Sequence, residues 1–353
     1  MHSLKSQPLN PAFWALTPKA GIVAARLMEK WERGKLFAGP SITKIPAGAV
    51  RFDSLMESVF RNFNKFHAHI FIMAAGIVVR TIAPCLKSKL SDPAVVVVDD
   101  HGRFAISLLS GHLGGANELA GQVARCLDAL PIITTATDIG HVPAVDLLAK
   151  RYNLAIENPH AIRTVHMAML QGQKIGLHDP LNLLSDDLAQ WVKDDFSPVD
   201  KSITGVFVDY KTIGLSSHIL VLRPKILSVG IGCNRNTKID EITGVLNDVF
   251  NKSGFSIKAI KNIATIEAKL DEQGIIGLAE FLKVPVRFFS RDQLAEVRSV
   301  PTPSEMVKKH MGVVSVCEAS AILASDQGKL AVPKQVAKNV TMAVAVNRSM
   351  LSA

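Results

Sequence analysis

The sequence predicts an α/β protein built from two or three units with mostly parallel sheets. Short apolar runs rich in β-branched residues alternate with segments of helical periodicity along most of the chain. The chain has 353 residues, which at roughly 100–200 residues per domain is enough for two or three domains. No internal repeat is evident, so we expect distinct units rather than a solenoid.

The composition is that of an ordinary globular protein with a basic surplus. Hydrophobic residues make up 48% and charged residues 20%, which excludes a disordered or fibrous chain. The net charge of +9 favours a negatively charged partner or substrate. Nucleic acid is not predicted, because the basic residues are dispersed and two Tyr with three Trp offer few surfaces for base stacking.

We expect a cytoplasmic protein without a membrane span. The longest apolar run, Ile70 to Val79, is about half of the ~20 residues needed to cross a bilayer. The first residues lack the apolar core of a secretory signal. The four cysteines form no C-x-x-C pair, and His67 and His69 share a strand face without a recognisable third ligand, so neither disulfides nor a protein-bound metal is expected.

The first predicted unit opens with a strand near 11–17, a helix over 20–31 and a strand over 69–73. Val95 to Val98 is entirely β-branched, and the turn residues that follow it lead into 104–109, which predicts a hairpin or a tight strand connection.

A helix is expected over 116–130, where Leu119, Val123, Leu127 and Leu130 follow helical spacing. Pro131 should end this helix, and a strand over 132–136 should follow.

The rest of the chain divides near Pro224. Helices are predicted over 145–152 and 161–171, whereas 179–198 is polar and interrupted and indicates a connecting region. The last unit should begin with a strand over 226–231 and a helix over 238–252. Thr237 with Asp240 should form its capping box, and Gly254 should stop it. The predicted units are therefore 1–140, 141–224 and 225–353.

The most informative string is SGHLGGANE at 110–118. Glycines allow a ligand close to the backbone, and the amino end of the following helix favours negative charge, so Ser110, Gly111, Gly114, Gly115 and Asn117 are candidate substrate contacts. His112 is a candidate general base, since imidazole changes charge near neutral pH. The alternative is a glycine-rich turn with a surface histidine. The string matches neither the P-loop nor the dinucleotide fingerprint.

Asp99 and Asp100 lie at a strand end, where α/β sheets place ligands, but aspartates in turns also bind their own backbone. Arg80 and Arg103 are candidate carboxylate contacts, with a solvated surface charge as the alternative for each. Ser110 does not stand in a nucleophile elbow, so water is the predicted nucleophile.

A second loop between strand and helix begins at Gly230. Asn234, Arg235 and Thr237 are candidate contacts to a second anionic group there, although Thr237 is also the expected helix cap. Cys233 is interpreted as a small packed thiol. Glu318 is interpreted as the acidic partner in a capping box with Ser315, not as a catalyst.

Several strings together resemble the cobalt-precorrin-5A hydrolase (CbiG) family of cobalamin biosynthesis. In the first part of the chain they are FIMAAGIVVR at 71–80, DPAVVVVD at 92–99, LLSGHLGGAN at 108–117 and TTATD at 134–138. In the last part, GIGC at 230–233, ATIE at 264–267, PSE at 303–305, SVCEA at 315–319 and VPK at 332–334 resemble the family's separate CobE-like domain. One departure is that Asn234 and Asn236 replace a basic residue and a glycine that the family usually has.

The resemblance implies an enzyme that opens the ring A δ-lactone of cobalt-precorrin-5A and releases the C20 two-carbon fragment as acetaldehyde, giving cobalt-precorrin-5B. The substrate is a polycarboxylate tetrapyrrole, which offers a cause for the positive charge. Its cobalt arrives with the substrate, so no cofactor of the protein's own is expected.

Within that family we expect water, activated by His112 or by Asp99 and Asp100, to attack the lactone carbonyl. The amides of Gly114 and Gly115 or Arg80 would stabilise the oxyanion. The alternative is a non-catalytic protein that binds the tetrapyrrole or hands it on in the same pathway. Contacts with pathway neighbours and a homo-oligomer are both compatible with the sequence.

Overall fold

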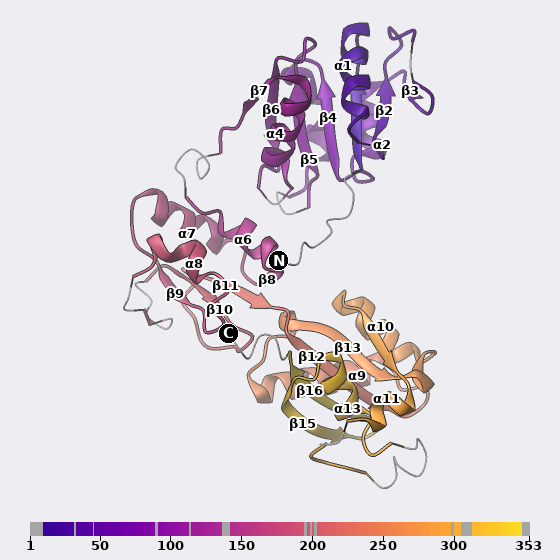
Figure 1. The fold of residues 1–353 in the computed structure, drawn as a ribbon, viewed down its shortest axis with the longest axis vertical. Helices are drawn as coiled ribbons and strands as arrows, with labels where there is room; N and C mark the ends of the chain where they lie inside the picture. Colours follow the sequence, from indigo (N-terminus) through magenta and orange to yellow (C-terminus); the bar gives the residue numbers. More distant parts are fainter. Residues whose placement is uncertain are drawn as a thin grey trace. The chain divides into compact units, whose positions relative to one another are not determined.

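The structure is a computed structural model that describes residues 10–31, 33–44, 46–88, 91–112, 114–135, 142–193, 196–197, 200, 203–297, 300–304 and 313–347. The chain forms two compact units, Met1–Leu147 and Leu148–Ala353, with one sheet in the first and two in the second (Figure 1). These sheets, with helices on their faces, confirm the predicted α/β class with mostly parallel strands. Among the described residues, no helix has the length and apolar character of a membrane span. The predicted bounds 1–140, 141–224 and 225–353 stay a prediction.

The first unit is built on a seven-stranded sheet with the order β3-β2-β1-β4-β5-β6-β7. Every neighbouring pair is parallel except β5 and β6, so β6 and β7 run against the other five strands. The strands are β1 (Pro11–Ala15), β2 (Lys35–Ala38), β3 (Val50–Arg51), β4 (Ala68–Ile72), β5 (Ala94–Val98), β6 (Phe104–Leu109) and β7 (Leu130–Ile132).

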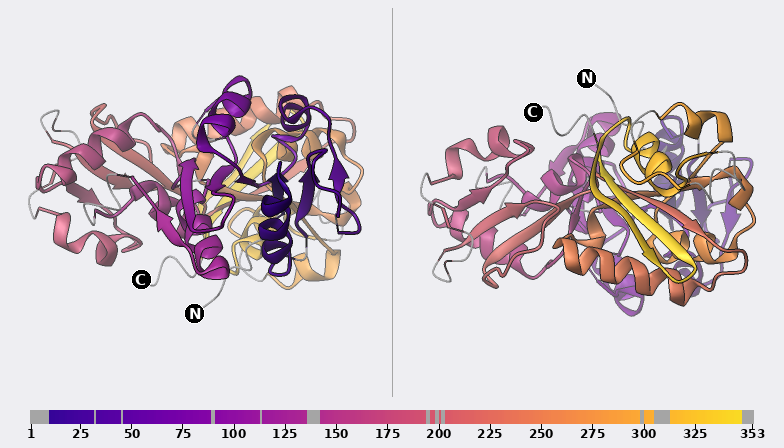
Figure 2. Two further views of the ribbon diagram at one scale, coloured as in Figure 1. Left: turned by 90° about the horizontal axis from the view of Figure 1, so that it is seen from above. Right: turned by 90° about the horizontal axis from the view of Figure 1, so that it is seen from below.

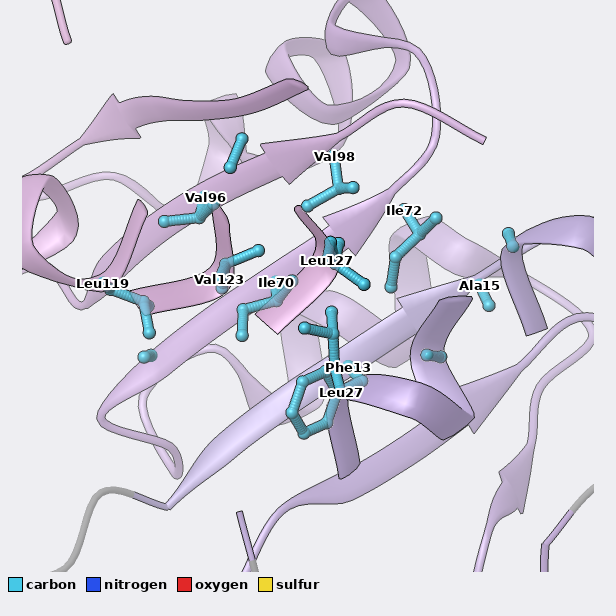
Figure 3. Close-up of a cluster of buried hydrophobic side chains, with 14 of the residues drawn as sticks. Phe13, Ala15, Leu27, Ile70, Ile72, Val96, Val98, Leu119, Val123 and Leu127 are labelled. Carbon is cyan, nitrogen blue, oxygen red and sulfur yellow. The ribbon is translucent and has the colours of Figure 1, made fainter. Parts of the chain in front are cut away.

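Helices cover both faces of this sheet, which explains the continuous apolar run of β5. The helices α1 (Pro18–Met28) and α4 (Ala116–Leu127) cover one face, where Leu27 and Leu119 pack with Phe13, Ile70 and Val96 of the strands (Figure 3). On the other face, α2 (Leu55–Asn62) and α3 (Ala75–Ile82) pack over a cluster that contains Trp14 and Phe71 of the strands.

The expected helix over 116–130 is wrong at its end. Helix α4 stops at Leu127, because Asp128 adopts a left-handed conformation with φ 58° and caps it. Pro131 therefore does not end a helix. It lies in β7, an edge strand, where proline's missing N–H is tolerated.

The region expected to be a connection contains a four-stranded sheet with the order β8-β11-β10-β9. Its strands are β8 (Leu154–Ile156), β9 (Gly176–His178), β10 (Gly205–Val208) and β11 (Ile219–Pro224), of which β8 alone pairs antiparallel. Most of these strands are too short to stand out in the sequence. The expected helices are confirmed as α6 (Val145–Arg151) and α7 (Ala161–Leu170), and a short α8 (Ser185–Leu188) follows.

A buried arginine connects this sheet to the next one within the second unit. Arg223 of β11 donates through Nε to Glu157 and through Nη1 to the carbonyl oxygens of Asp209 (2.8 Å) and Lys211 (2.6 Å). Glu157 also accepts a hydrogen bond from Ser256 Oγ at 3.4 Å. Since the guanidinium is almost fully buried, removing Glu157 would leave an uncompensated charge.

The last part of the chain forms a five-stranded sheet with the order β14-β13-β12-β16-β15. Helices α9 and α10 pack on one face, and α13 packs on the other beside the long β15–β16 hairpin (yellow in Figure 2, right). The elements are β12 (Leu227–Cys233), α9 (Ile239–Ser253), β13 (Ile260–Ile266), α10 (Gln273–Leu282), β14 (Val286–Phe289), α11 (Arg291–Ala295), α13 (Cys317–Ala324), β15 (Lys329–Ala337) and β16 (Val340–Val346).

The predicted stop of α9 is confirmed, and its predicted capping box is wrong. Gly254 caps the helix in a left-handed conformation with φ 64°. At the other end the N-cap is Lys238, which makes no side-chain cap bond. The Thr237 hydroxyl instead donates to the carbonyl of Asn234 at 2.8 Å, so it closes the preceding turn.

His69 is a core residue of the first unit and not half of a metal site. Trp14 Nε1 donates to His69 Nδ1 at 3.0 Å, so Nε2 carries the ring proton and donates to the carbonyl of Phe63 at 2.9 Å. Burial lowers the pKa of His69 to about 4, although the bond to Phe63 opposes this shift. His67 is exposed, and the described residues contain no group of three or more metal-ligating side chains.

This histidine predicts a specific acid sensitivity. The folded pKa of about 4 lies below the ordinary 6.5, so the unfolded chain binds the proton more tightly and stability falls as the pH drops from 6.5 to 4. The free energy of unfolding should fall by about 3 kcal/mol across that window. In a His69→Asn variant, denaturant unfolding followed by tryptophan fluorescence should lack this component. His67→Asn is the exposed control and should retain it; equal pH dependence in both variants would contradict the assignment.

Candidate active site

The antiparallel β5–β6 hairpin separates the residues that were expected to share one site. Asp99, Asp100 and Arg103 lie in its turn, whereas Ser110 and His112 follow β6 at the opposite edge of the sheet. A five-residue strand at ~3.3 Å per residue puts about 16 Å between these edges. One water molecule therefore cannot contact both His112 and the aspartates, so the two remain the alternative bases that the sequence left open.

Asp99 holds the hairpin turn together. Its carboxylate accepts hydrogen bonds from the amides of Arg103 (2.7 Å), Phe104 (2.8 Å) and His101 (3.3 Å). Burial raises the pKa of Asp99, but these amides and the Arg103 side chain outweigh that effect and lower it. The occupied oxygens favour the turn interpretation over the catalytic one.

Asp100 is also engaged in the first unit. Its Oδ2 accepts from Thr17 Oγ1 at 3.0 Å, and the same hydroxyl caps α1 by accepting from the amide of Ala20. The contact fastens the hairpin turn to the start of α1.

The loop from Ser110 to Gly115 folds on its own backbone. The amides of Gly115, Ala116 and Asn117 donate to the carbonyls of His112 (2.9 Å), Ser110 (3.1 Å) and Gly111 (3.0 Å). The Gly115 amide is thus not available as an oxyanion donor in this conformation, and that part of the prediction is wrong. The loop forms the tight turn before α4 that the sequence predicted. The amides at the start of α4, where an anion was expected, form hydrogen bonds within the loop instead.

The glycines of this loop are required by close approach. A Cβ at Gly114 would lie 2.4 Å from Ser110 Cβ, and one at Gly111 would lie 2.7 Å from Asn117 Oδ1. Gly115 has φ 86°, which side chains rarely adopt. The glycines therefore mark close packing, as the sequence predicted. The groups that approach them are residues of the protein, Ser110 and Asn117.

Asn117 anchors the first turn of α4 to two strands. Its Oδ1 accepts from Ser107 Oγ at 2.6 Å, and its Nδ2 donates to Thr135 Oγ1 at 3.1 Å. Ser110 Oγ adds a bond to the carbonyl of Asp92 at 2.9 Å. These bonds give the loop a fixed position on the sheet, from which His112 projects.

His112 lies beside a carboxylate that the sequence interpretation missed. His112 Nδ1 and Asp146 Oδ2 are 3.8 Å apart, and their side chains are 12% and 10% exposed. Asp146 is the second residue of α6 and the one acid in the run VDLLA, which is otherwise apolar. That buried acid in an apolar turn was the available signal. A histidine oriented by a carboxylate is the usual construction of a general base, and such contacts shorten when substrate binds.

The two candidate arginines of the first unit lie on its surface. Arg103 is 69% exposed, contacts Asp99 at 3.4 Å and lies 5.6 Å over the Phe104 ring. Arg80, in the last turn of α3, reaches back along its helix to within 3.7 Å of the Cβ position of Gly76. The solvated interpretation fits Arg103, and carboxylate binding by Arg80 stays a prediction.

The second candidate loop belongs to the other unit. Arg235 is exposed and bound to Asp271 and to the carbonyl of Ala268, and the Asp271 contact raises the Arg235 pKa. Asn234 donates through its amide and through Nδ2 to Asn339, both at 2.9 Å. Asn236 has φ 61°, which asparagine tolerates, and this explains how it replaces the glycine expected there.

Cys233 behaves as a packed thiol. Burial raises its pKa, although the nearby Lys269 opposes the shift, so the nucleophilic thiolate is disfavoured. The thiol interpretation from the sequence is supported.

Comparison with known proteins defines the class first. Three family models of cobalamin synthesis match in succession: the cobalamin synthesis G N-terminal region at residues 57–138, the cobalamin biosynthesis central region at 143–224 and the cobalamin synthesis G C-terminus at 227–345. The chain is thus a cobalamin-biosynthesis protein of this three-part type.

Individual relatives are more specific. The chain is 34% identical over 314 residues to the cobalt-precorrin-5A hydrolase of Priestia megaterium, covering 85% of this chain and 82% of that protein. It is 33% identical over 334 residues to the enzyme of the same name from Salmonella typhimurium, covering 92% and 94%. Protein CobE from a Sinorhizobium species is 29% identical over 121 residues, covering 34% and 79%. The chain belongs to the cobalt-precorrin-5A hydrolase family.

The loop geometry predicts how glycine substitutions differ. Gly114→Ala should lower the free energy of unfolding of the first unit by about 1–3 kcal/mol, because its Cβ would collide with Ser110. Gly121→Ala in α4 is the matched control, since its Cβ would meet only Arg125 Nη1 at 3.6 Å. This control should stabilise by up to about 1 kcal/mol. Denaturant unfolding measures both, and equal effects would contradict the packing described.

Proposed function

We propose that this chain hydrolyses cobalt-precorrin-5A to cobalt-precorrin-5B and acetaldehyde in cobalamin biosynthesis. The observation that carries the proposal is 34% identity over 314 residues to a cobalt-precorrin-5A hydrolase, with all three family regions present in order. The substrate is a cobalt-containing tetrapyrrole with acetate and propionate side chains. The net charge of +9 favours its approach.

The reaction divides into two chemical steps. Water adds to the carbonyl carbon of the ring A lactone, and cleavage of the acyl–oxygen bond leaves a ring A carboxylate and a hydroxyl on the C20 fragment. That hydroxyl then loses its proton and becomes the carbonyl of acetaldehyde as the carbon–carbon bond to the macrocycle breaks. The electron pair of this bond passes into the macrocycle, so one water is consumed and no oxidant is needed.

In this proposal the first step takes place at the Ser110 edge of the first unit. His112 removes a proton from the attacking water, and Asp146 orients the imidazole and stabilises the charge it acquires. The bonds of Asn117 and the packing of Gly111 and Gly114 hold the loop in place. Asp99 and Asp100 serve the hairpin turn at the opposite edge.

The remaining parts of the proposal concern the protein's surroundings. Cobalt is part of the substrate, and the proposed steps use no further metal or cofactor. We place the reaction in the cytoplasm, with neighbouring enzymes of the pathway supplying the substrate and taking up the product. Assembly into a homo-oligomer is compatible with this scheme.

Acetaldehyde release tests the proposed function. Purified protein incubated with cobalt-precorrin-5A should release one acetaldehyde per product formed. Release no higher than in the control without enzyme would remove the hydrolase assignment and leave a protein that binds the tetrapyrrole or hands it on.

The proposed base predicts a graded loss of turnover. His112→Ala should lower kcat by about 10²–10⁴-fold, because the proton acceptor for water is removed. Asp146→Asn should lower it by at least ~10-fold, because the imidazole loses its orienting charge. Initial rates of acetaldehyde release at saturating substrate measure both effects.

His101→Ala is the matched control, because His101 is an exposed histidine in the turn at the other edge of the sheet. It should keep kcat within about twofold, since proton transfer does not involve it. Asp99→Asn should weaken the hairpin yet keep kcat in the folded fraction. Full turnover in His112→Ala, or a loss in Asp99→Asn as large as the loss expected there, would contradict the placement of the site.

A further inference from the structure

The second unit contains a cavity at the edge of its five-stranded sheet. Its volume is ≈ 440 Å³, within the ~300–1,000 Å³ typical of small-molecule sites. Cys233 and Ile266 place it at the carboxyl ends of β12 and β13, the edge where α/β sheets bind ligands. Asn339 and Thr341, at the turn into β16, form another part of its wall.

The lining is cationic and rich in hydrogen-bond donors. Lys269, Lys334 and Lys338 line the cavity, and Asn234 and Ser315 add an amide and a hydroxyl. Among the described residues that form the wall there is no aspartate or glutamate. The amino end of α13 also lies in the wall, at Val316 and Cys317, and the dipole of the helix favours an anion there.

The carboxylates around the cavity bind groups of the protein itself, including Glu241, which accepts from Nδ2 of the lining residue Asn339 at 3.0 Å. Glu318 is fully buried and accepts from Thr302 Oγ1 (2.8 Å), the Thr302 amide (3.2 Å) and the Lys334 amide (3.0 Å). The Ser315 hydroxyl does cap the Glu318 amide at 3.3 Å, but the Glu318 carboxylate does not close the expected capping box. Glu318 thus fixes the strand that carries Lys334 and leaves the charge of the cavity positive.

A second buried acid neutralises only one of the three lysines. Lys269 Nζ bonds Glu272 at 3.0 Å, with side-chain exposures of 5% and 3%. Lys334 Nζ donates to the carbonyl of Thr302 at 2.6 Å, which holds its charge at the wall without cancelling it. Lys338 is exposed at the turn between β15 and β16. Two positive charges therefore remain for a ligand.

Glycines of β12 create the space. A Cβ at Gly230 would lie 1.8 Å from the carbonyl oxygen of Cys317, and one at Gly232 would lie 2.6 Å from Thr341 Oγ1. The missing Cβ of Gly230 lets the start of α13 lie directly against β12, and Gly232 lines the cavity without a side chain. The glycines of the GIGC string at 230–233 are thus explained by the close approach of α13 and Thr341 to β12.

We infer that this cavity binds carboxylate groups, and that its ligand is an acetate or propionate side chain of the tetrapyrrole. Lys334 and Lys338 supply the charge, and Asn234 and Ser315 supply oriented donors. The inference rests on the proposed function for the identity of the macrocycle. A free small polycarboxylate has the same chemistry and is distinguished by experiment.

The test uses the full chain and uroporphyrin, a tetrapyrrole with acetate and propionate side chains, in a fluorescence titration at low salt. Lys338→Glu should weaken binding by about tenfold or more, the effect of losing a charge-assisted bond and adding repulsion. Lys334→Gln should weaken it in the same direction. Lys329→Glu is the matched control, since Lys329 is an exposed lysine at the far end of β15, and it should stay within about twofold of the wild type.

Turnover separates this inference from the proposed function. Lys338→Glu should raise KM for cobalt-precorrin-5A and leave kcat unchanged. If the wild type releases no acetaldehyde, the proposed function fails, while the uroporphyrin titration still decides whether the cavity binds carboxylates. If Lys338→Glu and Lys334→Gln both bind uroporphyrin as Lys329→Glu does, the inference is overturned. Citrate serves as the free small polycarboxylate. If the variants weaken the binding of citrate but not of uroporphyrin, the inference that the ligand is a tetrapyrrole side chain is overturned.

Discussion

The arrangement of the first unit depends on one antiparallel pairing within an otherwise parallel sheet. Because β6 turns back along β5, the turn at Asp99 and the loop at Ser110 reach opposite sheet edges. Asp99 stabilises this reversal by accepting three backbone amides. The same reversal directs β7 toward the edge at which His112 lies beside Asp146. The catalytic proposal therefore follows from the direction of one strand.

The polar groups of both units serve mainly to fix loops, and this explains how candidate sites form at strand ends. In the first unit, Asn117 ties the glycine loop to two strands. In the second, the buried Glu318 holds Thr302 and the strand that carries Lys334. In each of these hydrogen bonds, both the donor and the acceptor belong to the protein. The loops fixed in this way carry the histidine–aspartate pair of the first unit and part of the lysine-lined cavity of the second.

The sequence was sufficient for the fold class and for the long, regular elements. Period and composition predicted the β5–β6 hairpin, the helices α4 and α9, and the stop at Gly254, because each signal was local. The four-stranded sheet was missed, since most of its strands are only three or four residues long. The sequence left the choice between His112 and Asp99 open for a different reason: closeness in the sequence does not reveal at which edge of a sheet a strand ends. Asp146 was missed because its contact with His112 spans 34 positions, and the acid in the apolar run VDLLA does not by itself show which residue it contacts.

The central claim is that lactone opening occurs at the Ser110 edge of the first unit. A crystal structure of the full chain with the product cobalt-precorrin-5B bound tests it most directly, because the ring A carboxylate marks where water attacked. We expect this carboxylate within hydrogen-bond reach of His112, with His112 and Asp146 in closer contact than the 3.8 Å seen here. A ring A carboxylate bound instead beside Asp99 and Asp100, with His112 facing solvent, would contradict it.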